Sequence, residues 1–329
     1  MSFVSIQGLT VAFDGTRVLH GIDLEIDRGE ALGLVGESGC GKSVTWLAAL
    51  GLLPGKAQVG GSVKIDGKEL IGAPRQQAEQ VRGKRIAMIF QDPSSSLNPV
   101  HRVGRQIMES LTLHRGLKGQ AAKAETVRLL DLVGIPSAAT RIDLYPHEFS
   151  GGQCQRIMIA MALAGEPDLL IADEPTTALD ATIQAQILDL LATIRAETGM
   201  AMVLISHDLG AVSAVCDRAA VMYAGRVVEM NDTATLFSAP RHPYTRGLFD
   251  AIPQIDGDRR RLTPIHGTVP DPKALPRGCA FSPRCGSASA QCATHSPELT
   301  AGRGNDLLAC FHPVVRSVSP VVSKELVLA

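Results

Sequence analysis

The chain has 329 residues, enough for one large domain with an appendage or for two modest domains. Its formal net charge of −1 gives no electrostatic case for nucleic-acid binding, which favours a strongly basic face, and leaves room only for local basic patches. No stretch approaches the roughly 18–20 continuous apolar residues that span a bilayer, and the N-terminus lacks the basic start and apolar run of a secretory signal. We therefore expect a cytoplasmic protein that contacts a membrane only through partners.

The N-terminal segment predicts an antiparallel β element. Residues 3–6, 9–13 and 22–26 are short apolar runs with strand composition. Asp14-Gly15 and Arg28-Gly29 are typical turn sequences between such strands.

A strand, a glycine-rich loop and a helix follow. Residues 31–35 are a short apolar run, and residues 43–53 have helical spacing that Pro54-Gly55 ends. The loop between them fits G-x-x-x-x-G-K-S and consists of Gly36, Glu37, Ser38, Gly39, Cys40, Gly41, Lys42 and Ser43, with Val44 next.

This loop has the chemistry of a nucleotide phosphate site. Its glycines let the backbone curl so that several N–H groups point at one anion, and the following helix adds its positive end. We expect Lys42 to reach the β- and γ-phosphates of ATP and Ser43 to ligate Mg²⁺. A purely structural glycine turn is the alternative, but the flanking strand and helix favour the phosphate loop.

Further strands and a helical insertion are predicted after the loop. Residues 63–67 indicate a strand and turn, and residues 85–90 a buried strand that ends at Gln91. Residues 100–165 have few β-branched runs and are expected to be mostly helical.

The next segment predicts a βαβ unit. Residues 169–173 and 201–205 are continuous apolar runs, which suit parallel strands buried on both faces, and a helix is expected over 182–197. At the end of the first run, Asp173 is expected to hold Mg²⁺ through water and Glu174 to polarise the attacking water as general base. A solvated strand end is the alternative for this acidic pair.

The segment Phe149-Ser150-Gly151-Gly152-Gln153 closely resembles the LSGGQ signature of ABC ATPases. The resemblance implies an α/β fold: a P-loop NTPase with a RecA-like core, an antiparallel β subdomain and a helical subdomain at about 92–165. It also implies that ATP is held between the phosphate loop of one domain and the signature residues, Ser150, Gly151, Gly152 and Gln153, of another.

Other motifs of that family follow in order, and their roles are implied by the same resemblance. Gln91 corresponds to the Q-loop glutamine that senses Mg²⁺, and His207 to the switch histidine that contacts the γ-phosphate. Asp180, in Ala178-Leu179-Asp180, corresponds to the D-loop, and Phe13 to the aromatic that stacks on adenine. An ordinary strand-core role is the alternative for Phe13.

The chain is most similar to the oligopeptide/dipeptide (peptide/nickel) importer branch of the ABC family. The segments that carry this likeness are Ala160 to Leu163, Ile171 to Asp180, Val221 to Gly225, His242-Pro243-Tyr244-Thr245 and Gly278 to Cys285. After about residue 235 Pro and Gly become frequent and apolar periodicity weakens, which predicts a boundary near residue 255. We therefore expect an ABC nucleotide-binding domain over 1–255 and a C-terminal extension over 256–329.

Four of the seven cysteines lie in that extension. Cys279, Cys285, Cys292 and Cys310 are separated by five, six and seventeen residues, which does not fit the paired ligands of usual zinc sites. Four thiolates also suit an iron–sulfur cluster, and the branch is associated with a [4Fe-4S] site, which the resemblance places at these cysteines. Zinc and unliganded thiols are the alternatives.

The resemblance implies an ATPase that powers import of di- and oligopeptides across the cytoplasmic membrane. The implied partners are a second ABC ATPase subunit, two transmembrane permease subunits and an extracytoplasmic substrate-binding protein, with no nucleic acid. The chain would lie at the cytoplasmic face of the membrane. Nickel, glutathione or sugar cargo is the first alternative; a soluble ABC ATPase of DNA repair or translation, or a subunit that binds ATP without hydrolysis, is the second.

Overall fold

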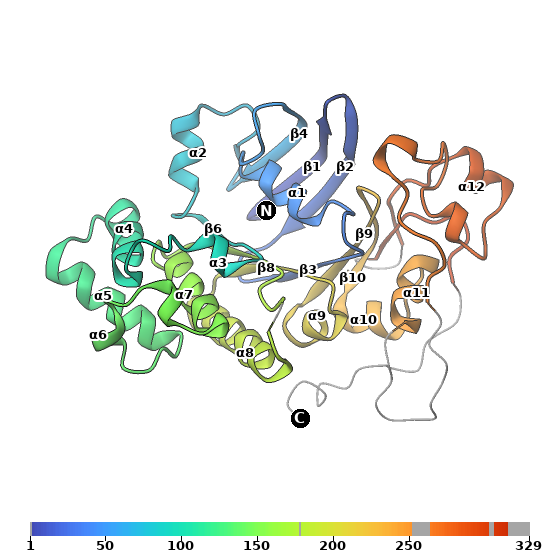
Figure 1. Ribbon diagram of the computed structural model, residues 1–329. Coiled ribbons are helices and arrows are strands. Elements are labelled where there is room, and N and C mark those ends of the chain that lie inside the picture. Colours follow the sequence, from blue (N-terminus) through green and yellow to red (C-terminus); the bar gives the residue numbers. More distant parts are fainter. Residues whose placement is uncertain (1, 178, 252–263, 303–305, 315–329) are drawn as a thin grey trace. The chain divides into compact units, whose positions relative to one another are not determined.

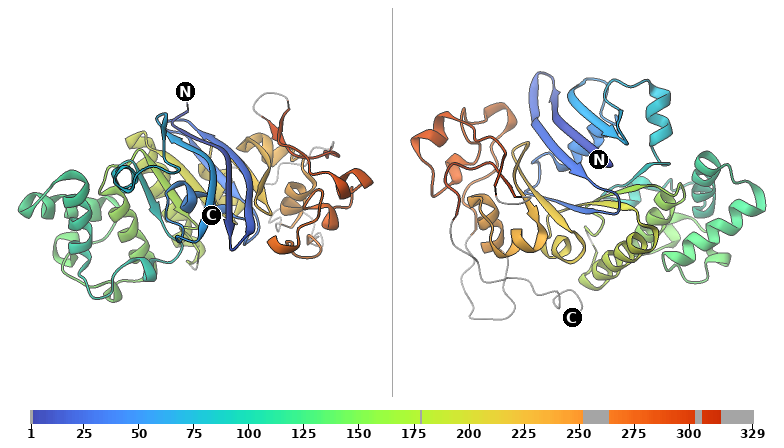
Figure 2. Two further views of the ribbon diagram at one scale, coloured as in Figure 1. Left: turned by 90° about the horizontal axis from the view of Figure 1, so that it is seen from above. Right: turned by 180° about the vertical axis from the view of Figure 1, so that it is seen from behind.

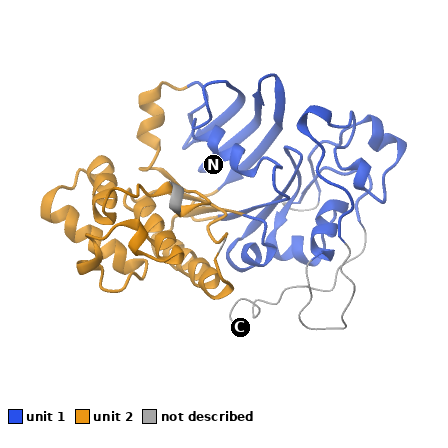
Figure 3. Cartoon of the chain, in the orientation of Figure 1, with its two compact units in different colours: residues 1–26, 31–72, 206–329 blue, residues 27–30, 73–205 orange. Residues whose placement is uncertain are grey.

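The computed structural model describes residues 2–177, 179–251, 264–302 and 306–314. The chain forms two compact units (Figure 3). Unit 1 contains residues 1–26, 31–72 and 206–329, and unit 2 contains residues 27–30 and 73–205. The phosphate loop and the cysteine-bearing C-terminal segment thus belong to the same unit.

Unit 1 begins with an antiparallel sheet in the order β2-β1-β4-β5, whose first strands lie side by side in Figure 2. The two N-terminal runs expected as separate strands form one strand, because the chain continues through Gly8 with a positive φ of 55° and a shift in register. The strands are β1 (Val4–Phe13), β2 (Thr16–Ile26), β4 (Ala57–Ile65) and β5 (Lys68–Glu69).

A second group of strands in unit 1 has the order β3-β9-β10-β12-β11. All five residues of β3 are buried, and β3 pairs in parallel with β9, while the remaining pairs are antiparallel. Complete burial explains its continuous apolar sequence. The strands are β3 (Ala31–Val35), β9 (Arg218–Tyr223), β10 (Arg226–Asp232), β11 (Thr300–Ala301) and β12 (Leu307–Leu308).

The helix after the phosphate loop is shorter than expected. It spans Lys42–Ala49 as α1 and ends before Gly51, whose φ of 61° is left-handed and breaks the helix ahead of Pro54-Gly55. The other helices and 3₁₀ turns of unit 1 are α9 (Leu209–Val215), α10 (Thr233–Ser238), α11 (Pro243–Asp250), η2 (Pro272–Ala274), η3 (Ser282–Arg284) and α12 (Ala290–Thr294).

Unit 2 contains the expected buried parallel strands, in the order β8-β7-β6. They are β6 (Ile86–Ile89), β7 (Leu169–Asp173) and β8 (Ala201–Ser206), of which residues 201–205 belong to this unit. Ile171 of β7 is opposite Met88 on one side and Val203 on the other. This register brings the carboxyl ends of β6 and β7 to the same edge, where Gln91 and Glu174 follow.

The predicted helical insertion is confirmed. In Figure 1, α4, α5 and α7 lie side by side, and they contact one another. The helices and 3₁₀ turn of unit 2 are α2 (Arg75–Val81), α3 (Pro93–Ser96), α4 (Val103–Arg115), α5 (Gly119–Leu132), α6 (Ala138–Arg141), η1 (Pro146–Glu148), α7 (Gly151–Leu163) and α8 (Ala181–Thr198). Among the described residues, no helix is both long and apolar enough to cross a membrane.

The predicted domain boundary near residue 255 falls within 252–263, outside the described residues. The division into a domain over 1–255 and an extension over 256–329 therefore stays a prediction.

Candidate functional site

The phosphate loop joins β3 to α1 in unit 1 with glycine conformations that other residues rarely adopt. Gly36 and Gly41 have φ values of 152° and 104°. A Cβ at Gly36 would collide with the carbonyl oxygen of Met222, and one at Gly41 with the side chain of Leu19. Both glycines are therefore required by backbone geometry and by close packing.

Lys42 lies folded over its own loop. It is 6% exposed, and its Nζ donates to the carbonyl oxygens of Gly36 (2.8 Å) and Glu37 (3.1 Å). The N-cap of α1 is Gly41, which has no side chain to cap the first N–H groups of the helix. A buried ammonium and uncapped helical N–H groups are suited to bind an anion. Ser43 and Val44, which follow, are half-buried.

Phe13 and His207 belong to unit 1, and each lies at or next to the end of a strand. Phe13 is the last residue of β1, is half-buried and is opposite Thr16 of β2 and Ala57 of β4. A half-exposed ring is compatible with stacking on a base and is less typical of the strand core. His207 follows β8 and is exposed.

The acidic pair of unit 2 lies at the end of β7. Asp173 is its last residue and is 7% exposed. Glu174 has a φ of 47°, and its N–H donates to the carbonyl oxygen of Ile205 at 2.9 Å. A left-handed conformation costs a non-glycine residue about 1–3 kcal/mol and persists where surrounding contacts hold it.

The carboxylate of Glu174 is held by two side chains of unit 2. Its Oε2 accepts from the Nε2 of Gln91 at 2.8 Å and from the Oγ1 of Thr177 at 3.0 Å. The structure thus brings together Gln91 and Glu174, which the sequence separates widely. Thr177 was not among the predicted site residues, although it lies only three residues after Glu174 in the sequence.

The signature segment forms the start of α7. Ser150 is the N-cap, and its Oγ accepts from the N–H of Gln153 at 3.3 Å, while the Gln153 Oε1 accepts from the Ser150 N–H at 3.2 Å. A Cβ at Gly151 would meet nothing within 4 Å, whereas one at Gly152 would lie 2.8 Å from Ile183. Gly151 therefore leaves open space at the helix start, and Gly152 permits close packing on α8.

The proposed D-loop aspartate also caps a helix. The Oδ1 of Asp180 accepts from the N–H of Ile183 at 3.0 Å at the start of α8. Ala178, in the same motif, lies outside the described residues. The capping role is established by geometry, and the D-loop role stays a prediction.

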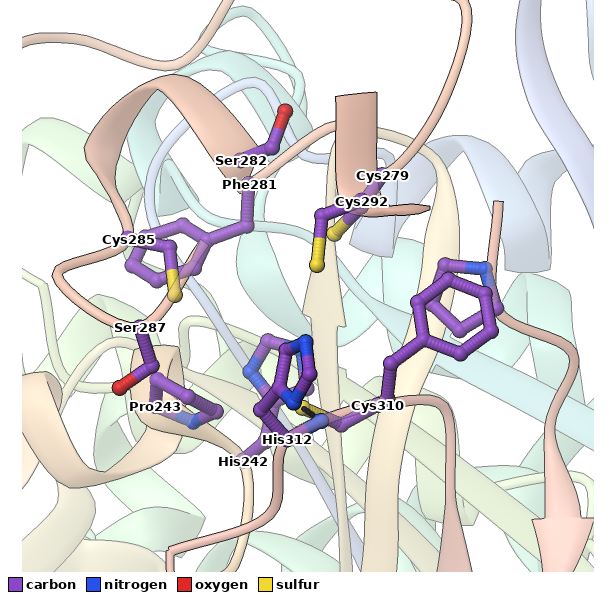
Figure 4. Close-up of a pocket in the computed structure, with 12 residues that line it drawn as sticks. His242, Pro243, Cys279, Phe281, Ser282, Cys285, Ser287, Cys292, Cys310 and His312 are labelled. Atoms are coloured by element: carbon purple, nitrogen blue, oxygen red, sulfur yellow. Dashed lines mark hydrogen bonds between the residues drawn. The ribbon is translucent and has the colours of Figure 1, made fainter. Parts of the chain in front are cut away.

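All four C-terminal cysteines line one pocket of unit 1 (Figure 4). Burial raises the pKa of the Cys279 and Cys285 thiols and raises that of Cys310 to about 11. His242, which the prediction did not include, also lines this pocket. His242 lies in the His-Pro-Tyr-Thr segment, and this family likeness is the sequence feature that could have indicated it.

The arrangement of these thiols does not support the expected cluster. Within the described ranges, no group of three or more His, Cys, Asp or Glu side chains is placed so that it could hold a metal ion. The four thiols have the chemistry of iron–sulfur or zinc ligands and line the same pocket. Their spacing, however, does not fit such a site.

Two further residues that sequence analysis missed contact the phosphate loop. Tyr244 accepts a hydrogen bond from the Glu37 N–H, and Arg284 forms an ion pair with the Glu37 carboxylate. Both residues lie in the C-terminal segments that carry the likeness to the importer branch. Nothing in the sequence of either segment indicates that it contacts the distant phosphate loop.

Two family descriptions match the chain: "ABC transporter" over residues 19–177 and "Oligopeptide/dipeptide transporter, C-terminal region" over residues 228–292. The oligopeptide transport ATP-binding protein OppD of Haemophilus influenzae is 47% identical over 94% of this chain and 96% of its own length. The dipeptide transport ATP-binding protein DppD of Bacillus subtilis is 44% identical over 97% of both chains. A putative peptide import ATP-binding protein of Brucella abortus is 54% identical over 84% of both chains.

The chain belongs to the oligopeptide/dipeptide branch of the ABC transporter ATP-binding proteins. It is therefore an ABC-type ATPase. Solved structures agree with this fold. A CbiO1 protein from Clostridium perfringens, part of an ABC transporter complex, has a TM-score of 0.63 and 30% identity over 72% of this chain and 90% of its own. A dimeric ATP-binding cassette bound to ADP and Pi has a TM-score of 0.63 and 26% identity over 70% of this chain and 98% of its own.

Proposed function

We propose that this ABC ATPase powers the uptake of di- and oligopeptides across the cytoplasmic membrane. The observation that carries the proposal is full-length similarity to proteins named for oligopeptide and dipeptide transport, including the match to the oligopeptide/dipeptide C-terminal region. Nickel, glutathione and sugars are the alternative cargoes, because the ATPase subunit does not itself contact the transported solute.

The nucleotide roles proposed for unit 1 follow from its anion-binding geometry. The loop from Gly36 to Val44 binds the phosphates of ATP, Lys42 contacts the β- and γ-phosphates, and Ser43 ligates Mg²⁺. Phe13 stacks on adenine and His207 contacts the γ-phosphate. The half-exposed ring of Phe13 and the exposed imidazole of His207 support these roles.

The roles proposed for unit 2 follow from its acidic pair. Asp173 holds Mg²⁺ through water, Glu174 takes the proton of the attacking water, and Gln91 senses the metal beside it. Ser150, Gly151, Gly152 and Gln153, with Asp180, contact the ATP bound by a partner subunit. The open helix start at Gly151 supports this role.

The proposed assembly contains a second ABC ATPase subunit, two transmembrane permease subunits and an extracytoplasmic substrate-binding protein. One phosphate loop and the signature segment of the other ATPase enclose each ATP, so that closure of the ATPase pair moves the permeases. The dimeric cassette with ADP and Pi supports such a pair. The chain then lies at the cytoplasmic face of the membrane.

The cargo proposal is tested by uptake in cells that lack this chain. We expect these cells to lose uptake of radiolabelled di- and oligopeptides, and the wild-type chain to restore it, because permeases without their ATPase cannot accumulate solute. Uptake of nickel, glutathione and a sugar is measured in the same cells as the control. Normal peptide uptake together with loss of one of these other cargoes would reject the peptide assignment.

We also propose that Cys279, Cys285, Cys292 and Cys310 ligate a [4Fe-4S] cluster with a structural role. The shared pocket and the thiol-only ligand set support this site in location and chemistry, whereas the spacing of the side chains does not. The anaerobically purified chain is expected to contain about four iron and four sulfide per chain. Cys285→Ser is expected to lose most of this iron, whereas Cys216→Ser, which alters a buried cysteine outside the pocket, is expected to retain it.

Three results of the metal assay lead to different conclusions. Iron and sulfide in equal amounts, lost in Cys285→Ser, support the cluster. Stoichiometric zinc without iron would assign the site to zinc instead. A chain free of both metals would leave four unliganded thiols and reject a metal site.

A further inference from the structure

We propose that Arg284 and Tyr244 are positioning residues for the phosphate loop, through which the C-terminal segment sets the affinity of this ATPase for ATP. The inference rests on the proposed role of that loop in phosphate binding. All the residues concerned belong to unit 1. Tyr244 and Arg284 lie beyond residue 177, where the match to the general ABC family ends.

Arg284 holds Glu37 with a two-pronged ion pair. Its Nη1 donates to one carboxylate oxygen of Glu37 at 2.9 Å, and its Nη2 donates to the other at 3.1 Å. The Arg284 side chain is 7% exposed and that of Glu37 is 28% exposed. Arginine binds carboxylates in this planar geometry, which fixes direction as well as distance, and burial reduces screening by solvent.

The guanidinium is itself fixed on its other sides. Its Nε donates to the carbonyl oxygen of His266 at 2.9 Å, and Nη1 also contacts the Tyr223 hydroxyl at 3.3 Å. The carbon of the guanidinium lies 6.0 Å from the centre of the Phe281 ring. Glu37 is therefore held by a group with little freedom to move.

Tyr244 acts on the backbone of the same loop residue. Its hydroxyl accepts from the Glu37 N–H at 2.9 Å, and the side chain is 0% exposed. Its ring packs against Tyr223 and Phe281 at centroid distances of 4.6 and 5.4 Å. Desolvation by burial raises its pKa, so the hydroxyl keeps its proton.

Tyr244 and Lys42 bind the same peptide group, the one between Gly36 and Glu37. Its N–H is bound by Tyr244, and its carbonyl oxygen accepts from the Lys42 Nζ at 2.8 Å. In a trans peptide these two groups point in opposite directions, so fixing one fixes the other. The orientation of the carbonyl that receives Lys42 thus depends on Tyr244, and the position of the Glu37 side chain depends on Arg284.

The local structure explains how the C-terminal segment presents these two side chains. His242 caps α11 by accepting from the Tyr244 N–H at 3.0 Å, and Pro243 begins the helix. Arg284 ends the short turn η3, between Cys279 and Cys285. The His-Pro-Tyr and Pro-Arg-Cys sequences therefore supply the two side chains that contact Glu37 of the phosphate loop. Under this proposal, both sequences contribute to nucleotide binding as well as to packing.

The test compares ATP binding with stability in the full-length chain. Binding of a fluorescent ATP analogue with Mg²⁺ gives Kd, thermal unfolding gives Tm, and the assembled transporter gives KM and kcat. We expect Arg284→Gln to raise Kd and KM for ATP by about tenfold or more, because a buried charge pair is broken. The effect on KM should exceed that on kcat.

Two conservative variants refine the test. Arg284→Lys keeps the positive charge but cannot donate two parallel hydrogen bonds to the carboxylate, so its affinity for ATP is expected to lie between those of Arg284→Gln and the wild type. Tyr244→Phe keeps the ring and removes the acceptor, and a rise in Kd of severalfold is expected from the loss of one buried hydrogen bond. Glu37→Gln added to Arg284→Gln should weaken binding by less than the product of the two single effects, because both remove the same contact.

Arg241→Gln is the matched control. Arg241 pairs with Asp306 in the same C-terminal segment, and its side chain is 37% exposed. We expect this control to lower Tm while leaving Kd within about twofold of the wild type, as for a pair without contact to the loop.

Equal losses of Tm in Arg284→Gln and Arg241→Gln, with Kd unchanged in both, would overturn the proposal and leave Arg284 a purely structural residue. Failure of the wild-type chain to bind the analogue would instead reject the proposed function of the loop. If Arg284→Gln does not fold, Arg284→Lys and Tyr244→Phe decide the outcome in the same assays.

Discussion

Glu174→Gln is expected to stop ATP turnover while ATP binding remains. Glutamine has nearly the shape of glutamate and still meets Gln91 and Thr177, but it cannot accept the proton of the attacking water. Loss of a general base typically costs about 10²–10⁴-fold in rate. Phosphate release by the assembled transporter measures the loss, and binding of a fluorescent ATP analogue shows that the site is intact.

The control for this variant is Glu197→Gln, which makes the same change of charge at an exposed position in α8. It is expected to hydrolyse ATP at the wild-type rate. Turnover by Glu174→Gln within about threefold of this control would show that another group accepts the proton, since a true base contributes far more.

Lys42→Ala is expected to weaken ATP binding strongly and, with it, hydrolysis. The ammonium is 6% exposed and is held over the phosphate loop by the carbonyl oxygens of Gly36 and Glu37. Removing one partner of a buried, hydrogen-bonded charge pair costs about 2–5 kcal/mol, which corresponds to a loss of roughly 30-fold to several thousandfold in affinity. Titration with the fluorescent analogue measures this loss directly.

Lys56→Ala provides the comparison, because Lys56 is an exposed lysine of the same unit. Its affinity for ATP is expected to equal that of the wild type. A Kd for Lys42→Ala close to the Kd of this control would place the phosphate site elsewhere in the chain.

The hydrogen bond between the Glu37 N–H and Tyr244 adds a condition to the Lys42 prediction. Lys42 binds the carbonyl oxygen and Tyr244 the N–H of one peptide group. A substitution at either residue therefore alters the orientation of the peptide group that the other residue binds. The effects of Lys42→Ala and Tyr244→Phe on ATP affinity are therefore not independent. This coupling links the loop to a segment that the general ABC match does not include.

Much of the architecture follows from local patterns. The apolar runs at 169–173 and 201–205 became buried parallel strands, and the segment from 100 to 165 became largely helical. Boundaries were less predictable. The pair of runs at 3–6 and 9–13 merged into β1, because pairing with β2 and β4 carries the strand through Gly8. Cross-strand pairing is a tertiary contact and leaves no signal in a short window of sequence.

The cysteines show the limit of spacing arguments. The four thiols and the family likeness indicated a cluster, and the structure places Cys279, Cys285, Cys292 and Cys310 around one pocket. Yet in the part of the chain that the structure describes, no three or more His, Cys, Asp or Glu side chains are arranged to hold a metal ion. Ligand distances depend on how the loops pack, and the sequence contains no measure of that packing.

The sequence by itself determined the chemistry of the phosphate loop, because glycines, a lysine and a serine at fixed spacing specify a backbone curl, a cation and a helix start within eight residues. Only the tertiary structure decided which residues that are distant in sequence contact one another within each unit. The parallel register of β6 and β7 brings Gln91 to Glu174, and the packing of α11 and η3 brings Tyr244 and Arg284 to Glu37. The physical reason is range: backbone conformation and caps are set by neighbours along the chain, whereas these contacts join residues that only the folded topology brings together.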